Sequence, residues 1–544
     1  MLLAAIIPLL AFVSLGAWAF SSPVGSSPDD DFHLAAVWCG LGERDGLCEN
    51  PDDGSQDRLV PASLPTAPCY AFNPEQSGEC WVPDESGLIT VTRANIDGLY
   101  PPLFYATMSI FASEDIQASV MAMRLFNAAL AVGLLTAVFF VLPRWTRPAL
   151  IVSVAATSVP LGAFVLASTN PSAWAVLSAA VVWIALYGAT QTAGRRRYAL
   201  AGLALFGALL GAGARADAAV YACFAVVLAL ILGARLHRDA LIPAVTGGII
   251  VLVSAVFYLN AAQGGAVVTG MTEGNPPLTG GQLLSNLLEI PSLWIGAVGG
   301  WHLGWLDTRL PATVPILVMV VVAGALFVGI RRLDLRRLVA LLLVLASLWV
   351  VPFVLLYQSR VVVGTIIQPR YLLPLLVIAI GVASLRRDAE SSWNGGRLGL
   401  AAAALTVAFT VSLQFNIQRY TTGTDESSLD PGANAEWWWN GAPSPAFVWV
   451  LGSLAFAGML ALFALALPRP EREASTAWTA EPAPEGSDRA VAEPVAQPAE
   501  EGSDLARTVP LADDDLDPRP HGVADVVPQP ASAAEPAGKD HPVA

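Results

Sequence analysis

The chain has 544 residues, of which 55% are hydrophobic and only 13% are charged, and its mean hydropathy is +0.57. Because soluble globular domains carry about 25% charged residues, this composition excludes an ordinary soluble enzyme and predicts an integral membrane protein. The formal net charge is −15, and we expect no nucleic-acid partner.

Apolar runs predict twelve membrane-spanning helices, because a backbone in lipid must satisfy its hydrogen bonds within a helix of about 20 residues. The runs cover residues 2–20, 119–142, 149–168, 171–190, 198–214, 217–234, 240–260, 312–330, 338–358, 370–385, 398–415 and 446–467. The segment 281–305 is partly apolar, but Pro291 and five glycines interrupt it. We therefore expect an interfacial or re-entrant segment there, within an all-α polytopic fold.

Arginine predicts the orientation of these helices. Six linkers that fall on one side of the predicted spans hold 16 basic residues. Since cytoplasmic linkers are enriched in Lys and Arg, both termini are expected in the cytoplasm and the loop 21–118 outside a cell membrane, with lipids as partners. The run 2–20 could instead be a cleaved signal peptide, because Ala17-Trp18-Ala19 resembles a cleavage site, although no basic segment precedes it.

Four of the five cysteines lie in the predicted outer loop: Cys39, Cys48, Cys69 and Cys80. An even set in one exposed loop predicts two disulfides and an oxidising compartment. Proximity favours the pairs 39–48 and 69–80 among the three possible pairings. A zinc site is the alternative, although the spacing lacks the tight pairs of a zinc ribbon.

Residues 468–544 form a second region, which follows the membrane domain 1–467 and is rich in Pro, Ala and acids. From Glu471 onward, 16 acids outnumber 5 bases. Such a segment buries too little apolar surface to offset the entropy of ordering. We expect a disordered cytoplasmic tail that carries most of the net charge.

Three acids and a histidine follow the first span: Asp29, Asp30, Asp31 and His33. Carboxylates at a membrane face can deprotonate a hydroxyl, or hold a divalent cation such as Mg²⁺ or Mn²⁺ that binds phosphate. The alternative is a helix N-cap, where acids suit the helix dipole, with a structural His33. Because three consecutive acids exceed the needs of a cap, we predict that Asp29, Asp30 and His33 are catalytic and that the first two are the metal ligands.

Arginines also lie in or at the outer ends of predicted spans, against the positive-inside trend. Arg124, Arg215 and Arg370 are the strongest cases. Misplaced charge in a membrane protein usually marks a pathway or a binding site, and the guanidinium fork suits phosphate. A local ion pair with Asp217 is the alternative for Arg215, and snorkelling to the interface is the alternative for Arg370.

Aromatic and amide side chains complete the predicted substrate-binding set. Tyr100 and Tyr105 flank two prolines that fix the backbone before the second span. Trp305 lies in a Gly-Trp segment, and Asn170 occupies a polar turn between two spans. Tyr371 adjoins Arg370, and Asp217, two residues after Arg215, also belongs to the predicted substrate-binding set. The alternatives are an interfacial tryptophan anchor and a simple helix break.

In chain order, these motifs resemble a bacterial family of polytopic membrane proteins of unknown function, which is similar in turn to the C-type integral-membrane glycosyltransferases. The motifs are Pro28-Asp29-Asp30 with His33, Tyr100-Pro101-Pro102 with Tyr105, Arg124, Asn170-Pro171, the segment 299–305 and Pro369-Arg370-Tyr371-Leu372-Leu373-Pro374. The resemblance implies a GT-C-like bundle, a polyprenyl-phosphate-linked sugar as donor, and Asp29 or Asp30 as general base or metal ligand. The cysteine-bearing segment 39–80 departs from the pattern and leaves the acceptor open.

The sequence thus predicts transfer of a sugar from a polyprenyl phosphate to a cell-envelope acceptor on the outer face. The alternative is a transporter or flippase for envelope lipids or polysaccharide, whose arginines bind headgroups without chemistry. A non-catalytic scaffold is a third possibility. The sequence contains no Gly-rich phosphate loop with a lysine and no repeat of the hydropathy pattern between its halves, which argues against a pump driven by ATP and against many secondary transporters.

Overall fold

The computed structural model describes residues 2–55, 57–65, 67–83, 87–91, 93–234, 240–272, 274–331, 333–386 and 395–466. These residues belong to one compact unit. The predicted tail 468–544 lies outside the described residues, so its predicted disorder stays a prediction.

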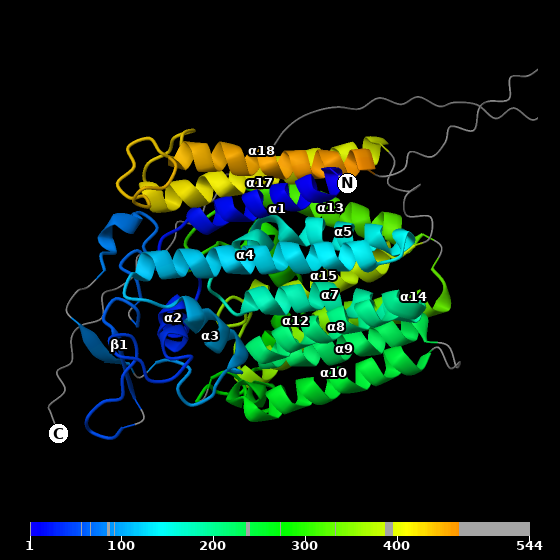
Figure 1. Cartoon of the computed structure of the whole chain (residues 1–544), viewed down its shortest axis with the longest axis horizontal. Helices are drawn as coiled ribbons and strands as arrows, with labels where there is room; N and C mark the ends of the chain where they lie inside the picture. The colour runs from blue at the N-terminus through cyan, green and yellow to red at the C-terminus, as the bar shows by residue number, and fades with distance from the viewer. Residues whose placement is uncertain are drawn as a thin grey trace, which may run out of the picture. The chain divides into compact units, whose positions relative to one another are not determined.

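The described chain is mainly helical, as its composition predicts (Figure 1). Its long helices are α1 (Leu2–Phe20), α4 (Ile116–Val141), α5 (Arg147–Thr157), α7 (Ser172–Thr190), α8 (Gly194–Ala214), α9 (Ala216–Gly233), α10 (Leu241–Asn260), α12 (Gly280–Ile295), α13 (Thr313–Ile330), α14 (Leu335–Ser359), α15 (Leu373–Ser384), α17 (Gly395–Thr421) and α18 (Pro445–Ala466). Shorter elements are α2 (Asp30–Trp38), α3 (Leu103–Met108), α6 (Ala163–Leu166), α11 (Ala266–Thr269), β1 (Arg58–Pro61) and β2 (Leu88–Val91).

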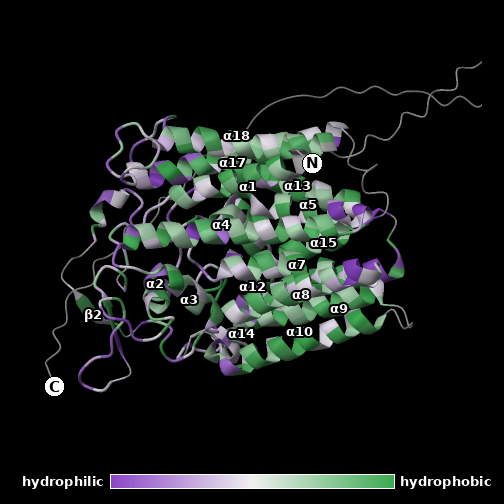
Figure 2. Cartoon of the chain, viewed as in Figure 1, coloured by the Kyte–Doolittle hydropathy of each residue, from purple (hydrophilic) through white to green (hydrophobic). Residues whose placement is uncertain are grey.

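The lengths and composition of these helices suit a membrane. Within the described ranges, 11 helical segments are long and apolar enough to span one, and two shorter apolar helices lie at Ala5–Phe20 and Leu373–Ser384. Figure 2 shows apolar residues along the middle of the bundle and hydrophilic residues gathered at its two ends. Apart from α12, these helices are the twelve predicted spans, and the polytopic all-α fold is confirmed.

Helix α12 is long enough to cross, but its last turn reaches only the middle of α14, where the Trp294 indole donates to the Leu348 carbonyl at 3.2 Å. Near its start, the Asn286 side chain donates to the Val361 carbonyl at 2.9 Å and accepts from the Val363 amide at 3.0 Å, just beyond α14. After its end, the Trp305 indole donates to the Gly25 carbonyl at 2.9 Å. The chain therefore enters and leaves on one side, which agrees with the predicted re-entrant segment.

The third predicted span is broken near its middle. Helix α5 ends at Thr157, and a wide turn over Ser158–Gly162 leads into α6. Pro160 has no amide hydrogen to continue the helix. A Cβ on Gly162 would stand 2.5 Å from the Thr157 carbonyl oxygen, so the turn needs a glycine there.

The predicted outer loop is a folded cap on one end of the bundle. It contains α2, α3 and a two-stranded antiparallel sheet of β1 and β2. Disulfides join Cys39 to Cys48 and Cys69 to Cys80, which confirms the pairing favoured by proximity. Covalent bonds therefore close two short loops within this cap.

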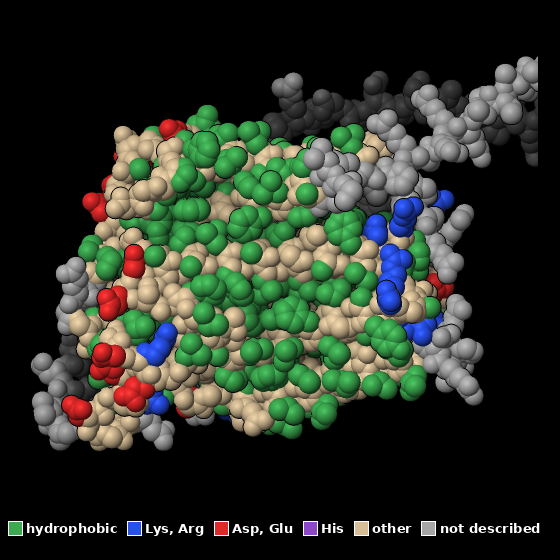
Figure 3. Space-filling model, viewed as in Figure 1, with side chains coloured by type: hydrophobic (Ala, Val, Ile, Leu, Met, Phe, Trp, Pro, Cys, Tyr) green, Lys and Arg blue, Asp and Glu red, His purple; other side chains and the backbone are tan. Residues whose placement is uncertain are grey.

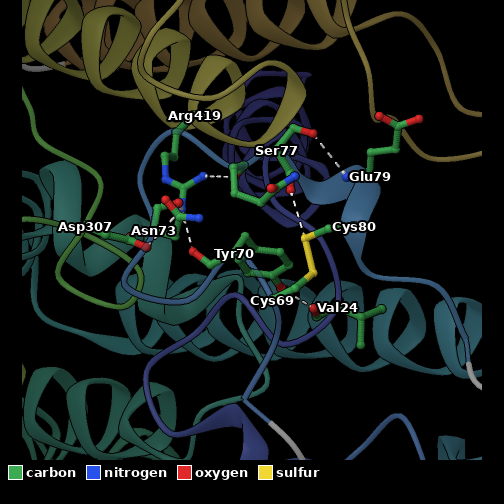
Figure 4. The surroundings of a disulfide bond; sticks show 10 residues. Val24, Cys69, Tyr70, Asn73, Ser77, Glu79, Cys80, Asp307 and Arg419 are labelled. Atoms are coloured by element: carbon green, nitrogen blue, oxygen red, sulfur yellow. Dashed lines mark hydrogen bonds and ion pairs between the residues drawn. A yellow bond between two sulfur atoms is a disulfide. The ribbon is translucent and has the colours of Figure 1, made fainter.

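A buried arginine joins the second disulfide loop to the helices (Figure 4). The Arg419 guanidinium, near the end of α17, donates to the carbonyls of Tyr70, Asn73 and Gln76 at 2.8, 3.0 and 2.6 Å. It also pairs with Asp307 at 2.9 Å. Because a buried charge is stable only when paired and hydrogen-bonded, these contacts fix the cap against the bundle.

Cysteine labelling tests the disulfides and the orientation together. In a Cys223→Ser background in intact cells, a membrane-impermeant maleimide should label the chain only after reduction, because the outer cysteines are paired. The control Arg195→Cys, an exposed position at the arginine-rich end, should label only after permeabilisation. Labelling of the loop cysteines without reductant, or only in permeabilised cells, would contradict the prediction.

Candidate functional site

The aspartate cluster lies where the cap enters α2. Asp29 is the residue before the helix, its φ of 61° is left-handed, and its carboxylate makes no capping bond. Aspartate is among the residues that tolerate this conformation. The side chain is 39% exposed and contacts Arg370 at 2.5 Å and Arg93 at 3.7 Å. Asp29 therefore faces guanidinium groups instead of capping the helix.

Arg370 reaches Asp29 from a position 341 residues later in the chain. It lies in a single turn, Pro369–Tyr371, whose first proline has a φ suited to a helix start. The side chain is 6% exposed, its guanidinium carbon is 5.2 Å from the Tyr371 ring centre, and its Nε has no hydrogen-bond partner among the described atoms. The Nε–H of Arg370 is thus a buried donor that is left to bind a hydrogen-bond acceptor.

Asp30 is fully buried and holds two segments together. Its carboxylate accepts from the Ser27 amide and from the Thr169 hydroxyl, both at 3.0 Å. Burial raises the pKa of Asp30 to about 6, although nearby Arg124 opposes this change. Of the two predicted catalytic aspartates, Asp29 is therefore the one that an acceptor can reach.

Arg93 belongs to the site but carries no distinguishing sequence signal. It is 57% exposed and pairs with Asp31, whose other carboxylate oxygen is buried without a partner among the described atoms. The same loop holds Arg44 and Arg58, and nothing in the sequence separates the three arginines. Only the fold brings one of them to the acids.

His33 packs among aromatic rings beneath the acids. Its Nδ1 is 2.9 Å from the Tyr105 hydroxyl, and the rings of Phe32 and Tyr100 lie 5.3 Å away between centres. Burial lowers the pKa of His33 to about 3, although Asp29 opposes this effect. A general base works best with a pKa near the operating pH, so the geometry favours the structural alternative for His33.

The predicted aromatic wall is assembled around Arg215. Its guanidinium carbon is 5.6 Å from the Tyr100 ring centre and 5.0 Å from that of Tyr371. Asp217 binds it through two contacts of 2.8 and 2.9 Å, so the local ion pair is present. Burial raises the pKa of Tyr100 to about 12, which keeps its hydroxyl protonated at neutral pH.

Three predicted substrate-binding residues instead contact the backbone that carries the acids. Arg124 is buried in α4 and donates to three carbonyls and a hydroxyl. Its partners are Ala19 O at 2.9 Å, Ser22 O at 2.6 Å, Pro23 O at 2.6 Å and Ser26 Oγ at 3.0 Å. Asn170 donates to the Pro28 carbonyl at 2.9 Å, and Trp305 contacts Gly25 as described above. In this conformation they position the segment 19–28.

A small cavity of about 20 Å³ adjoins this site. Its lining includes Pro28, Arg370 and Trp301. Such a volume holds about one water molecule. This cavity therefore has no room for a phosphate group beside Arg370.

The predicted divalent cation does not fit this arrangement of donors. Asp29 and Asp31 are engaged by guanidinium groups, and Asp30 by two hydrogen-bond donors. Within the described part of the chain, no group of three or more His, Cys, Asp or Glu side chains could hold a metal ion. Mg²⁺ demands near-octahedral oxygen ligands, which these engaged carboxylates do not provide.

An all-helical membrane bundle with a charged site beneath a disulfide-bonded cap defines a polytopic integral membrane protein. The family described as "Predicted membrane protein (DUF2142)" matches residues 12–379, and the chain belongs to this family. No curated protein matches the chain. Membership confirms the predicted membrane family, and the likeness to C-type glycosyltransferases stays a prediction.

Removal of Arg124 tests its positioning role. Arg124→Met should lower the free energy of unfolding by about 3 kcal/mol, because it leaves buried carbonyls without donors. Thermal unfolding in detergent measures this change. Arg144→Met, at an exposed arginine of the opposite end, is the matched control and should change little. Equal effects of the two variants would contradict the role.

The opposite pKa shifts of Asp30 and His33 predict how stability depends on pH. The fold raises the pKa of Asp30 from 3.8 to about 6. Protonated Asp30 therefore stabilises the fold at low pH, and this stabilisation is lost as the pH rises from 3.8 to about 6. It lowers the pKa of His33 from 6.5 to about 3, so that contribution is lost as pH falls below 6.5. The two effects oppose one another between pH 4 and 6.

When the pH falls from 6.5 to 4.5, the unfolding temperature of Asp30→Asn should therefore fall by more than that of wild type. In this variant only the destabilising effect of His33 remains. Thermal unfolding at both pH values measures this difference. Asp97→Asn, at an exposed carboxyl of the same loop, should follow wild type. Parallel curves for Asp30→Asn and wild type would show that burial does not raise the pKa of Asp30.

Proposed function

We propose that the chain transfers a sugar from a polyprenyl phosphate to a cell-envelope acceptor at the capped end of the bundle. The observation that supports this most is the contact of Asp29 with Arg370 at 2.5 Å. It joins a partly exposed carboxylate to a guanidinium with an unused donor. Activation of an acceptor hydroxyl needs such a carboxylate, and stabilisation of a departing phosphate needs such a guanidinium.

Asp29 is the proton acceptor in this proposal. Burial raises the pKa of Asp29, but nearby positive charges, Arg370 first and also Arg93 and Arg215, keep the pKa below its ordinary value. The group is therefore ionised at neutral pH. The acceptor oxygen bonds to C1 of the sugar, the bond from C1 to the phosphate oxygen breaks, and the acceptor proton goes to Asp29.

The arginines receive the leaving group. The electron pair of the broken bond departs with the polyprenyl phosphate, whose added negative charge Arg370 and the exposed Arg93 neutralise. Because the adjoining cavity holds about one water molecule, the phosphate replaces Asp29 as the partner of Arg370. Loss of that guanidinium raises the pKa of Asp29 toward its ordinary value, which makes it a stronger base when the donor is bound.

Aromatic rings form the remaining wall. Tyr100 and Tyr371 present ring faces beside Arg215, which is itself neutralised by Asp217. Rings of this kind suit the apolar face of a sugar or the first units of a prenyl chain. Arg215 thus contributes to the wall more than to phosphate binding.

A transfer assay tests the proposal. Membranes that contain the full chain are supplied with radiolabelled polyprenyl-phosphate sugars, and label in envelope material is measured. Asp29→Asn should lower the rate of sugar transfer at least about 100-fold, as expected for removal of a general base. Asp97→Asn, an exposed acid of the same loop, should retain it.

Two results would contradict the proposal. Equal transfer by wild type and Asp29→Asn would remove this carboxylate from the mechanism. In proteoliposomes, movement of the labelled lipid across the bilayer without a new glycosidic bond would favour the transporter alternative.

A further inference from the structure

A second cavity, of about 380 Å³, lies within the bundle away from the acids. Helices α1, α4, α5, α6, α17 and α18 line it, almost wholly with apolar side chains such as Leu135, Ile151 and Phe463. Ligand cavities of proteins have volumes of about 300–1,000 Å³. Its size and lining suit a flexible hydrocarbon chain.

Most of the cavity lies in the half of the bundle near the arginine-rich end, and Ala163 and Leu166 of α6 extend its lining toward the cap. Its lining runs from Ile7 in α1 and Arg147 at the start of α5 to Phe409 and Phe456 near the middles of α17 and α18. Phe140 lines it and is 45% exposed, so the cavity reaches the surface of the bundle.

Packed rings lie at its other end. Phe409 and Phe456 stack with their centres 4.2 Å apart, and Trp18 packs edge-on against Phe409 at 6.0 Å. Trp18 is 2% exposed and lies two residues before the end of α1. These rings lie between the part of the cavity lined by α17 and α18 and the end of α1, and Leu166 of α6 extends the lining toward the cap.

Basic side chains surround the open end. Arg147 lines the cavity, and its Nε donates to the Leu142 carbonyl at 3.2 Å. Arg196 donates to the same carbonyl at 3.4 Å, and Arg144 begins the turn before α5. Figure 3 shows arginine side chains gathered mainly at this end and most of the acids at the other. Among the described residues, no carboxylate forms an ion pair with any of the three arginines.

We propose that this cavity binds one acyl chain of an anionic phospholipid from the leaflet at the arginine-rich end, with the phosphate near Arg147 and Arg196. The apolar lining accounts for the acyl chain, and the arginines, which form no ion pair with a described carboxylate, account for the anionic headgroup. The proposal does not depend on glycosyl transfer, because none of the acids or arginines of the candidate site lines the cavity.

The test measures lipid binding to the full chain in detergent by native mass spectrometry. The probes are phosphatidylglycerol and phosphatidylcholine with identical acyl chains. Wild type should bind phosphatidylglycerol more tightly. Arg147→Gln should weaken that binding about fivefold, which corresponds to about 1 kcal/mol for one basic residue near a lipid surface, and should leave phosphatidylcholine unchanged.

Further variants separate charge from cavity. Arg196→Gln removes an exposed charge without altering the lining and should act in the same direction as Arg147→Gln. Ala11→Phe partly fills the cavity and should weaken binding of both lipids. Arg331→Gln, an exposed arginine at the end of α13, is the matched control and should have no effect.

Three outcomes would overturn the proposal. The first is equal binding of the two phospholipids by wild type. The second is equal binding by Arg147→Gln, Arg196→Gln and Arg331→Gln. The third is tighter binding of undecaprenyl phosphate that persists without Arg147 and is lost in Ala11→Phe, because it would assign the cavity to a prenyl chain.

Discussion

A guanidinium buried within the bundle determines where the acids lie. Arg124 is 1% exposed, and an uncompensated charge at such a site is costly. Its compensation comes from main-chain oxygens at the end of α1 and from the Ser26 hydroxyl. The chain must therefore turn back over this arginine before it enters α2. That turn, reinforced by Asn170 and Trp305, sets Asp29 against Arg370.

Much of this architecture could be predicted from the sequence, because the bilayer limits it strongly. Helix length and hydropathy follow from membrane thickness. The predicted break at Pro291 is absent, because α12 continues through this residue and ends at Ile295, before the glycines of the segment 296–300. Counting spans placed Asp29, Tyr100 and Arg370 on one face, and the structure brings them together. The disulfide pairing followed from proximity, because nearby cysteines close the smallest loops.

The separate roles of the residues within the site could not be predicted from the sequence. Asp29 and Asp30 are neighbours in sequence, and only the left-handed backbone at the first sends one carboxylate outward and the other into the core. The positioning role of Arg124 depends on distances that spacing does not encode. Arg93 resembles the other arginines of its loop and enters the site only because the cap folds over the acids.

The most direct test of this account is a cryo-electron microscopy structure of the full chain in a lipid nanodisc. The account predicts that the Asp29 carboxylate contacts the Arg370 guanidinium beneath the disulfide-bonded cap, with Arg124 buried against the end of α1. Density that places these two side chains at opposite ends of the bundle, or directs Arg124 into lipid, would contradict it.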